Sequence, residues 1–320
     1  MSTSVPAVSI VLPTYKVTAY IADALNSLRA QTFREFETIV VNDGCPDTEN
    51  LEKVLELYRD EIVYLKQKNE GPSSARNTGI RAARAPLIAM LDPDDIWEPD
   101  YLEVHLAMLK AQPEVDIVYP NARFTGHTPF VGKTVMDIFP SRGEVTFQSI
   151  VLNQCLVFIG LTARRETLLR AGLFDPAIRS SEDMEFWLRL AKMGARFKYH
   201  QRPLVQYRCR PSSLSEDHIW MGQNLLKVYA KFDAMPDLTA EQREALNTAI
   251  QREKANLDFY LGKKALYAQN REEALERLAR ANLVMRDKKV TLGLLALRFA
   301  PQLLYKLVYR RHPTEHSFMH

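Results

Sequence analysis

The stretch that decides the fold is IAMLDPDDIWEPDY, residues 88–101. The apolar run from Leu87 to Leu91 stops abruptly at three carboxylates, Asp92, Asp94 and Asp95. An apolar run of this length that ends in turn residues is typical of a buried strand in a parallel sheet. The acids therefore follow the carboxyl end of a strand, which is where open α/β sheets bind their ligands.

The spacing of these acids allows two interpretations. Asp92 and Asp94 are two residues apart and could share one hard cation through their oxygen atoms. Such a cation would relieve the repulsion among three neighbouring carboxylates. The plainer interpretation is an acidic turn before a helix that begins near Pro99, since aspartate is a good N-cap and proline fits a first helical turn.

An alternation of strands and helices surrounds this stretch. Strands are expected at 8–12, 38–41, 62–65 and 115–119, and helical spacing of apolar residues fills the segments between them. This order predicts a doubly wound α/β sheet with helices on both faces. The chain has no G-x-G-x-x-G after its first strand and no G-x-x-x-x-G-K-[ST], which argues against a dinucleotide-binding fold of that type and excludes a P-loop.

The second half of the chain changes character near residue 215. Before that point, late strands are expected at 156–163, 196–199 and 204–207, the segment 126–143 reads as irregular, and a helix is expected to start at Ser180-Ser181-Glu182-Asp183. Beyond it, helices are expected at 218–232, 239–269 and 271–285. The sequence thus predicts an α/β domain at 1–215, a helical appendage at 216–289 and a basic amphipathic tail at 290–320.

Composition limits the class of protein. A net charge of +3 over 320 residues is too small to indicate nucleic acid as a partner. Cys45, Cys155 and Cys209 are widely spaced, which argues against a zinc site or a disulfide scaffold and suits a reducing compartment. The N-terminus has no signal-peptide pattern, so we expect a cytoplasmic protein.

The tail reads VTLGLLALRFAPQLLYKLVY from 290 to 309 and then Arg310-Arg311-His312. Arg298, Pro301 and Lys306 interrupt it, so it is not expected to span a bilayer. Apolar bulk with a basic end fits a helix at the inner membrane surface through 290–312, that is, a peripheral membrane contact. A helix that packs on its own domain or on a second subunit of a homo-oligomer fits equally well.

Five segments, taken together, resemble the inverting family-2 glycosyltransferases with the GT-A fold. They occur in the order of that family and cover about the first two-thirds of the chain. The segments are VSIVLPTYK at 8–16, QTFREFETIVVNDGCPD at 31–47, NEGPSSARNTGI at 69–80, LDPDDIWEPDYLE at 91–103 and SEDMEFWLRLAKMG at 181–194.

The resemblance implies a mixed Rossmann-like sheet and the transfer of a sugar from a nucleotide-diphosphate donor, by family habit UDP-linked. The acceptor would be a hydroxyl of a saccharide, a lipid-linked glycan or a polysaccharide. Asp94 would bind a divalent cation, Mn²⁺ or Mg²⁺, and Asp92 would lie near the ribose or the water shell of the metal. Asp183 would be the catalytic base, and Glu182 would orient the acceptor.

The resemblance also implies a set of residues around the nucleotide. Asp43 would accept a hydrogen bond from the base, with Pro13 and Tyr15 flanking it; an Asx-turn with Gly44 is the local alternative for Asp43. Arg76 and Asn77 would lie beside the nucleotide, although Arg76 could equally brace two strands.

Two positions leave further alternatives open. A plain helix cap is the alternative for Asp183, and Ser181 could supply that cap. Arg210 stands where relatives often carry a metal-facing histidine; an arginine cannot bind metal but could neutralise diphosphate.

Other classes of protein fit the sequence less well. A nucleotidyltransferase that acts on a sugar phosphate would want a Gly-rich basic loop where Pro13-Thr14-Tyr15 stands. An aspartate-nucleophile phosphatase would want threonine or valine at Ile96. A non-catalytic carbohydrate-binding protein would tolerate the loss of Asp94 and Asp183, and both acids are present.

Overall fold

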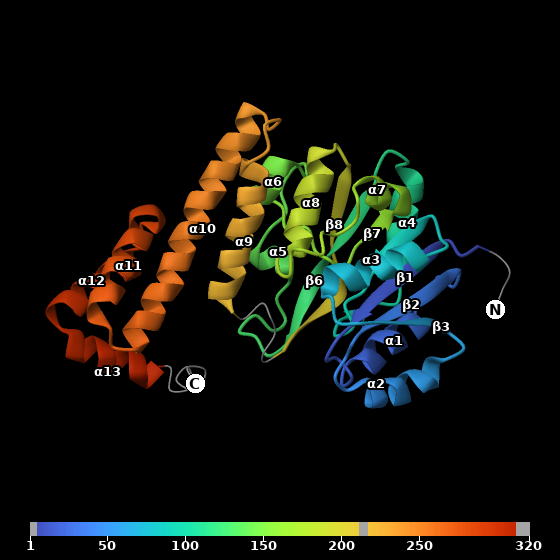
Figure 1. The fold of residues 1–320 in the computed structure, drawn as a ribbon, viewed down its shortest axis with the longest axis horizontal. Coiled ribbons are helices and arrows are strands. Elements are labelled where there is room, and N and C mark those ends of the chain that lie inside the picture. The colour runs from blue at the N-terminus through green and yellow to red at the C-terminus, as the bar shows by residue number, and fades with distance from the viewer. Residues whose placement is uncertain (1–4, 211–216, 312–320) are drawn as a thin grey trace. The chain divides into compact units, whose positions relative to one another are not determined.

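The computed structural model describes residues 5–210 and 217–311, and the chain divides into two compact units, 1–213 and 214–320. The first unit contains a mixed sheet covered by helices, and the second consists of helices (Figure 1). Each unit is described separately below.

The first unit is built on an eight-stranded sheet with the order β3-β2-β1-β4-β7-β6-β8-β5. Its strands are β1 (Val8–Thr14), β2 (Phe36–Asp43), β3 (Ile62–Gln67), β4 (Leu87–Met90), β5 (Ile96–Trp97), β6 (Ile117–Gly126), β7 (Thr162–Arg164) and β8 (Phe197–Cys209). β1, β2, β3 and β4 are parallel, β7 runs antiparallel between β4 and β6, and β5 runs antiparallel to β8. The expected mixed α/β sheet is confirmed.

Helices lie on both faces of this sheet (Figure 1). They are α1 (Ile21–Arg29), α2 (Thr48–Leu55) with the 3₁₀ turn η1 (Glu56–Tyr58), α3 (Pro72–Ala82), α4 (Tyr101–Ala111), α5 (Val135–Ile138), α6 (Phe147–Val151), α7 (Arg165–Arg170) and α8 (Glu182–Lys192). α3 packs against β1 and β2. Gly79 allows this close approach, because a Cβ at that position would collide with the side chain of Val11.

The order of the strands determines where a ligand can bind. From β1 the chain builds outward through β2 to β3, and it then returns to place β4 on the other side of β1. The two directions of winding meet between β1 and β4, which is the topological switch point at which open α/β sheets bind ligands beyond the carboxyl ends of their strands. Pro13 lies near the end of β1 and Tyr15 follows that strand, whereas Asp92 and Asp94 follow β4.

Several element boundaries differ from the sequence expectation. The strand expected at 156–163 shrinks to β7, and the two expected at 196–199 and 204–207 form the single strand β8, whose pairing with β6 changes register near Asn121. Pro99 lies just before the N-cap Asp100 instead of inside the helix. The two-residue strand β5 was not anticipated, since nothing in so short a segment marks it as a strand.

A buried aromatic group anchors β5 and α4. The rings of Trp97 and Tyr101 are stacked with centroids 3.7 Å apart, His105 lies 4.1 Å from Tyr101, and His200 of β8 lies 5.3 Å from His105. Nδ1 of His105 is 2.9 Å from the hydroxyl of Thr162. Burial lowers the pKa of His105 well below the usual histidine range and lowers that of His200 to about 4, so both rings are neutral at pH 7.

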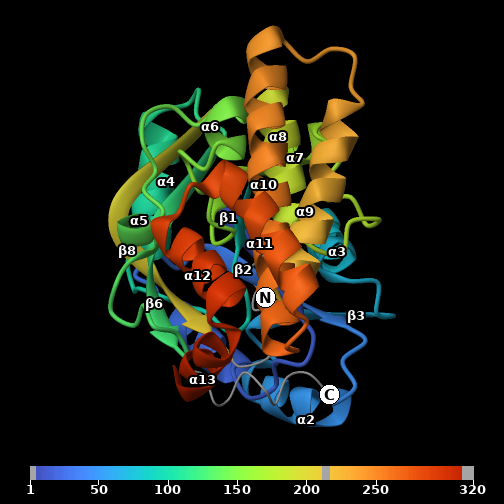
Figure 2. The ribbon, with the colours of Figure 1, turned by 90° about the vertical axis from the view of Figure 1, so that its left-hand side faces the viewer.

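The second unit consists of α9 (His218–Asp233), α10 (Ala240–Tyr267), α11 (Arg271–Met285), α12 (Lys288–Phe299) and α13 (Pro301–Arg311) (Figure 2). α9 and α11 pack on the long helix α10, and α12 and α13 follow at the end of the chain. The expected helical appendage is therefore present. Within residues 5–210 and 217–311, none of the helices combines the length and the apolar content that crossing a bilayer requires.

One face of the tail packs on its own unit. Leu297 of α12 and Tyr305 of α13 form a buried cluster with Ala265 and Ala274. The two helices part at Ala300, just before Pro301, the residue expected to interrupt the apolar run. The opposite face of α12 remains exposed and is considered below.

Candidate active site

The acidic stretch forms a turn between β4 and β5. The backbone N–H of Asp95 donates to the carbonyl of Asp92 over 3.0 Å. Asp95 itself is 2% exposed, and its Oδ1 accepts a 3.0 Å hydrogen bond from the backbone N–H of Arg208 on β8. Burial, reinforced by the charges of Asp92 and Asp94, raises the pKa of Asp95 well above its usual range. Asp95, to which the sequence assigned no role, therefore fastens the turn to β8 and leaves Asp92 and Asp94 partly exposed.

Arg76 joins the two halves of the site. Its Nη2 is 3.0 Å from Oδ1 of Asp92, which follows β4, and its Nη1 is 2.7 Å from Oε1 of Glu182, at the start of α8. The guanidinium also lies over the ring of Phe174, with 5.5 Å between the carbon and the centroid. Arg76 is 6% exposed, and the two carboxylates raise its already high pKa, so it remains a buried cation. As a brace, Arg76 joins the end of β4 to the start of α8 and not two strands to each other. Its place beside the nucleotide stays a prediction.

Asp183 lies next to this bridge. Its Oδ1 accepts a 2.7 Å hydrogen bond from the backbone N–H of Met184, which leaves Oδ2 as the second oxygen. Burial, together with the charge of Glu182, raises the pKa of Asp183 to about 6, while Arg76 acts in the opposite direction. A carboxylate with this pKa is ionised at pH 7 and still holds a proton well enough to act as a general base.

Ser181 places these acids without capping the helix. Its backbone is left-handed, with φ of 57° and ψ of 28°, and its side chain makes no capping hydrogen bond to α8. The alternative in which Ser181 is a conventional cap is therefore wrong. A non-glycine residue in this conformation is strained, and such residues cluster at functional sites.

Asp43 ends β2 and holds the loop before α3. Its Oδ1 accepts hydrogen bonds from Nε2 of Gln67 at 2.8 Å and from the backbone N–H of Glu70 at 2.9 Å. Its Oδ2 accepts a 2.9 Å bond from the N–H of Gly71, a residue with φ of 91°. The Asx-turn suggested for Asp43 is not formed, because the N–H of Cys45 donates instead to Oδ1 of Asn42, over 2.8 Å.

Pro13 and Tyr15 lie at the carboxyl end of β1, beside the end of β2. The register pairs Pro13 with Val41 and Thr14 with Asn42, which brings Pro13 and Tyr15 close to Asp43. The Tyr15 side chain is 40% exposed. A ligand that lies along this edge can therefore meet an aromatic face and a carboxylate together.

Asn77 is the predicted site residue that the structure does not bring to this edge. It is 1% exposed, and its side-chain amide exchanges two hydrogen bonds with the backbone of Phe174: Nδ2 donates over 2.8 Å and Oδ1 accepts over 2.9 Å. The amide is thus committed to holding the segment before α8 against α3. Nothing in the local sequence marks this pairing, which spans 97 residues.

Arg210 approaches Asp94 from the end of β8. Its Nε is 2.6 Å from Oδ2 of Asp94, and its guanidinium lies 5.3 Å from the ring centroid of Tyr20. Burial, together with the charge of Asp92, raises the pKa of Asp94, and Arg210 opposes that shift. A cationic side chain thus stands at the expected metal position.

The residues present suit a divalent cation only in part. Among the residues that the structure describes, no group of three or more His, Cys, Asp or Glu could hold a metal. Asp92 and Asp94 each have one oxygen paired with an arginine. Two carboxylates completed by substrate phosphates are a common way for proteins to bind Mg²⁺, so the pair fits a cation that arrives with a diphosphate.

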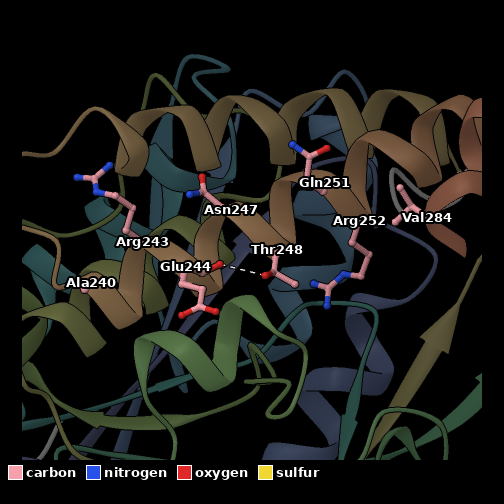
Figure 3. A pocket seen from close by; sticks show the side chains of 8 residues that line it. All are labelled: Ala240, Arg243, Glu244, Asn247, Thr248, Gln251, Arg252 and Val284. Carbon is pink, nitrogen blue, oxygen red and sulfur yellow. Dashed lines mark hydrogen bonds between the residues drawn. The ribbon is translucent and has the colours of Figure 1, made fainter.

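A separate groove lies on the second unit (Figure 3). It is wide open, has a volume of about 840 Å³ and is lined by Ala240, Arg243, Glu244, Asn247, Thr248, Gln251, Arg252 and Val284. All of these residues belong to α10 and α11, whereas every acid described above belongs to the first unit. The groove is therefore distinct from the acidic edge of the sheet.

A sheet of this topology, with acids at its switch point, is the arrangement of the GT-A fold. The model of glycosyl transferase family 2 matches residues 9–160. The Bacillus subtilis protein EpsH is named as a glycosyltransferase. It is 30% identical to this chain over 260 residues, which cover 77% of this chain and 74% of EpsH. The chain belongs to the family-2 glycosyltransferases.

Solved structures agree on the fold. The structure of S. aureus TarS 1-349 in complex with UDP-GlcNAc matches with a TM-score of 0.61 at 17% identity, covering 96% of this chain and 92% of that one. The mannosyltransferase PcManGT of Pyrobaculum calidifontis, in complex with GDP-Man and Mn²⁺, matches with a TM-score of 0.63 at 19% identity, covering 95% and 84%. The chain spans only 29–31% of the length of several Rickettsia relatives that it also matches.

Proposed function

We propose that this chain transfers a sugar, with inversion at the anomeric carbon, from a UDP-linked donor to a hydroxyl of a saccharide or lipid-linked acceptor. The observation that carries the proposal is the bridge made by Arg76. It joins Asp92, at the donor edge of the sheet, to Glu182, the neighbour of Asp183. A base beside the donor edge is what an inverting displacement needs.

The reaction requires one proton to be removed while one bond is exchanged for another. The acceptor oxygen forms a bond to the anomeric carbon, and the bond from that carbon to the diphosphate breaks, with its electron pair leaving on the diphosphate. Oδ2 of Asp183 takes the proton of the acceptor hydroxyl, because Oδ1 is held by the N–H of Met184. Glu182, fixed by Arg76, positions the acceptor beside Asp183.

The donor would lie along the carboxyl ends of β1, β2 and β4. Tyr15 and Pro13 offer a face to the nucleobase. Asp43 is a candidate acceptor for a base N–H, and its three hydrogen bonds to the protein hold it in place. Structural neighbours are complexes with UDP-GlcNAc and with GDP-Man, so the choice of a UDP-linked donor belongs to this proposal.

Asp94 and Asp92 would hold a divalent cation, Mn²⁺ or Mg²⁺, which when bound neutralises negative charge on the leaving diphosphate. Support comes from their position beside the switch point and from the Mn²⁺ complex of PcManGT. Arg210 supplies a second positive charge at the same place, 2.6 Å from Asp94. It would turn to the diphosphate when the donor binds.

The test is Asp183→Asn. Asparagine keeps the Oδ1 acceptor for Met184 and removes the base, so we expect donor binding to persist while kcat falls about 10²–10⁴-fold. Because burial raises the pKa of Asp183 to about 6, its ionised form costs the folded state up to about 3 kcal/mol at pH 7, and the variant should be at least as stable as the wild type.

Calorimetry with the donor, transfer assays and thermal unfolding give the three readouts. The exposed acid Glu56 provides a matched control, and Glu56→Gln should leave transfer unchanged. Full transfer by Asp183→Asn would exclude Asp183 as the base.

A further inference from the structure

The two faces of α12 differ in what they contact. Leu297 is fully buried in the cluster with Ala265 and Ala274. Leu292, Leu295 and Phe299 lie on the opposite side, at helical spacing, and are 69%, 51% and 78% exposed. Leu303 of α13 is 60% exposed and adds a fourth large apolar side chain. We call Leu292, Leu295, Phe299 and Leu303 the tail stripe.

The charges around the tail stripe are nearly all positive. The segment 286–306 carries Arg286, Lys288, Lys289, Arg298 and Lys306, all exposed, against the single acid Asp287. Asp287 is the N-cap of α12 and accepts the N–H of Lys289 over 2.6 Å. Arg298 also lies 5.9 Å from the ring of Phe299. These five basic residues, which we call the basic rim, thus flank the exposed apolar side chains along helices that are too short to span a bilayer.

We propose that the tail stripe docks on an anionic lipid surface. Apolar side chains enter the boundary between headgroups and acyl chains, while lysine and arginine extend to the anionic headgroups. The charge pattern selects this occupant over a second copy of the chain. A two-fold dimer through the tail stripe would set two basic rims against each other, whereas an anionic membrane attracts each of them.

The test uses the full-length protein and vesicles of phosphatidylglycerol mixed with phosphatidylcholine. We expect it to sediment with them, less at about 0.5 M salt than at about 0.1 M, because salt screens the basic rim. It should not sediment with pure phosphatidylcholine. The double variant Leu295→Asp/Phe299→Asp should bind about ten-fold more weakly or worse, because two apolar anchors are lost and two negative charges are added.

The matched control is Leu57→Asp, since Leu57 is 71% exposed on the first unit and lies outside the tail. Point variants are preferable to truncation at Val290, which would expose the Ala265–Ala274 cluster. Circular dichroism checks that each variant folds.

Three results would overturn the proposal: absence of binding by the wild type, equal binding by the double variant, or a stable dimer that the double variant dissociates. The last result would assign the tail stripe to a second copy. None of these readouts depends on sugar transfer, so they are independent of the proposed activity.

Discussion

Replacing Arg76 tests whether its bridge between Asp92 and Glu182 sets the pKa of Asp183, the proposed base. In Arg76→Ala, Asp92 and Glu182 lose their shared cation, to which they are bonded over 3.0 and 2.7 Å. Removing one partner of a buried ion pair costs about 3–5 kcal/mol. Because the side chains of Asp92 and Glu182 are 26% and 13% exposed, water compensates part of this loss, and we expect a destabilisation of about 2–4 kcal/mol.

The pH dependence of catalysis gives the diagnostic result. Arg76 lowers the pKa of Asp183, which burial holds near 6. Without the arginine, Asp183 should lose its proton only at higher pH, so the acidic limb of kcat/KM against pH should move upward by about one unit. Arg76→Lys keeps the charge but cannot reach both carboxylates with a planar fork, and it should fall between wild type and alanine.

Arg84→Ala is the matched control for this experiment. Arg84 pairs over 2.8 Å with Glu37, which is 8% exposed and lies near the amino end of β2. The bridge of Arg76 starts instead at Asp92, beyond the carboxyl end of β4. This variant should lose stability without moving the pH profile. If Arg76→Ala left the acidic limb in place, or moved it downward, the coupling of Arg76 to the base would be refuted.

Two further predictions concern other groups. His105 and His200 are neutral in the folded state, whereas in the unfolded chain both histidines take up protons below about pH 6.5. The free energy of unfolding should therefore fall as the pH drops from about 6.5 toward 4, by up to about 3 kcal/mol for His200. His200→Gln should flatten this slope in urea titrations, and an unchanged slope would contradict it. Asp94→Ala should weaken the binding of both Mn²⁺ and the donor. Arg210→Ala removes the partner of Asp94, so it should strengthen the binding of Mn²⁺ in the absence of donor and weaken the binding of the donor. Calorimetry showing that both variants keep wild-type affinities would contradict the assignment.

The parallel part of the sheet was predictable because its strands are apolar on both faces. Val8, Ile10, Val11 and Leu12 are all fully buried, and such a continuous run is visible in sequence. β5 and β7 contain only two and three residues, and their pairing depends on β8 and β6. Such short strands have no local signature, so β5 was missed and the bounds of β7 were not predicted.

The site was predictable as a set of residue types but not as a set of contacts. Asp92 and Asp94 were candidates because carboxylates at a strand end are conspicuous, and Asp183 was a candidate because of the family resemblance. The partners of Asn77 and Arg76 were not, since Phe174 lies 97 and Glu182 lies 106 residues further along the chain. Periodicity does not encode such distant pairings.

The bridge of Arg76 also has a consequence for the order of events during synthesis. One of its partners is 16 residues away and the other is 106, so a ribosome must extend the chain past α8 before the second contact can form. A nascent chain that ends before Glu182 contains β1 to β4, but it lacks Glu182 and Asp183. The activity proposed above would therefore have to wait until α8 has been synthesised.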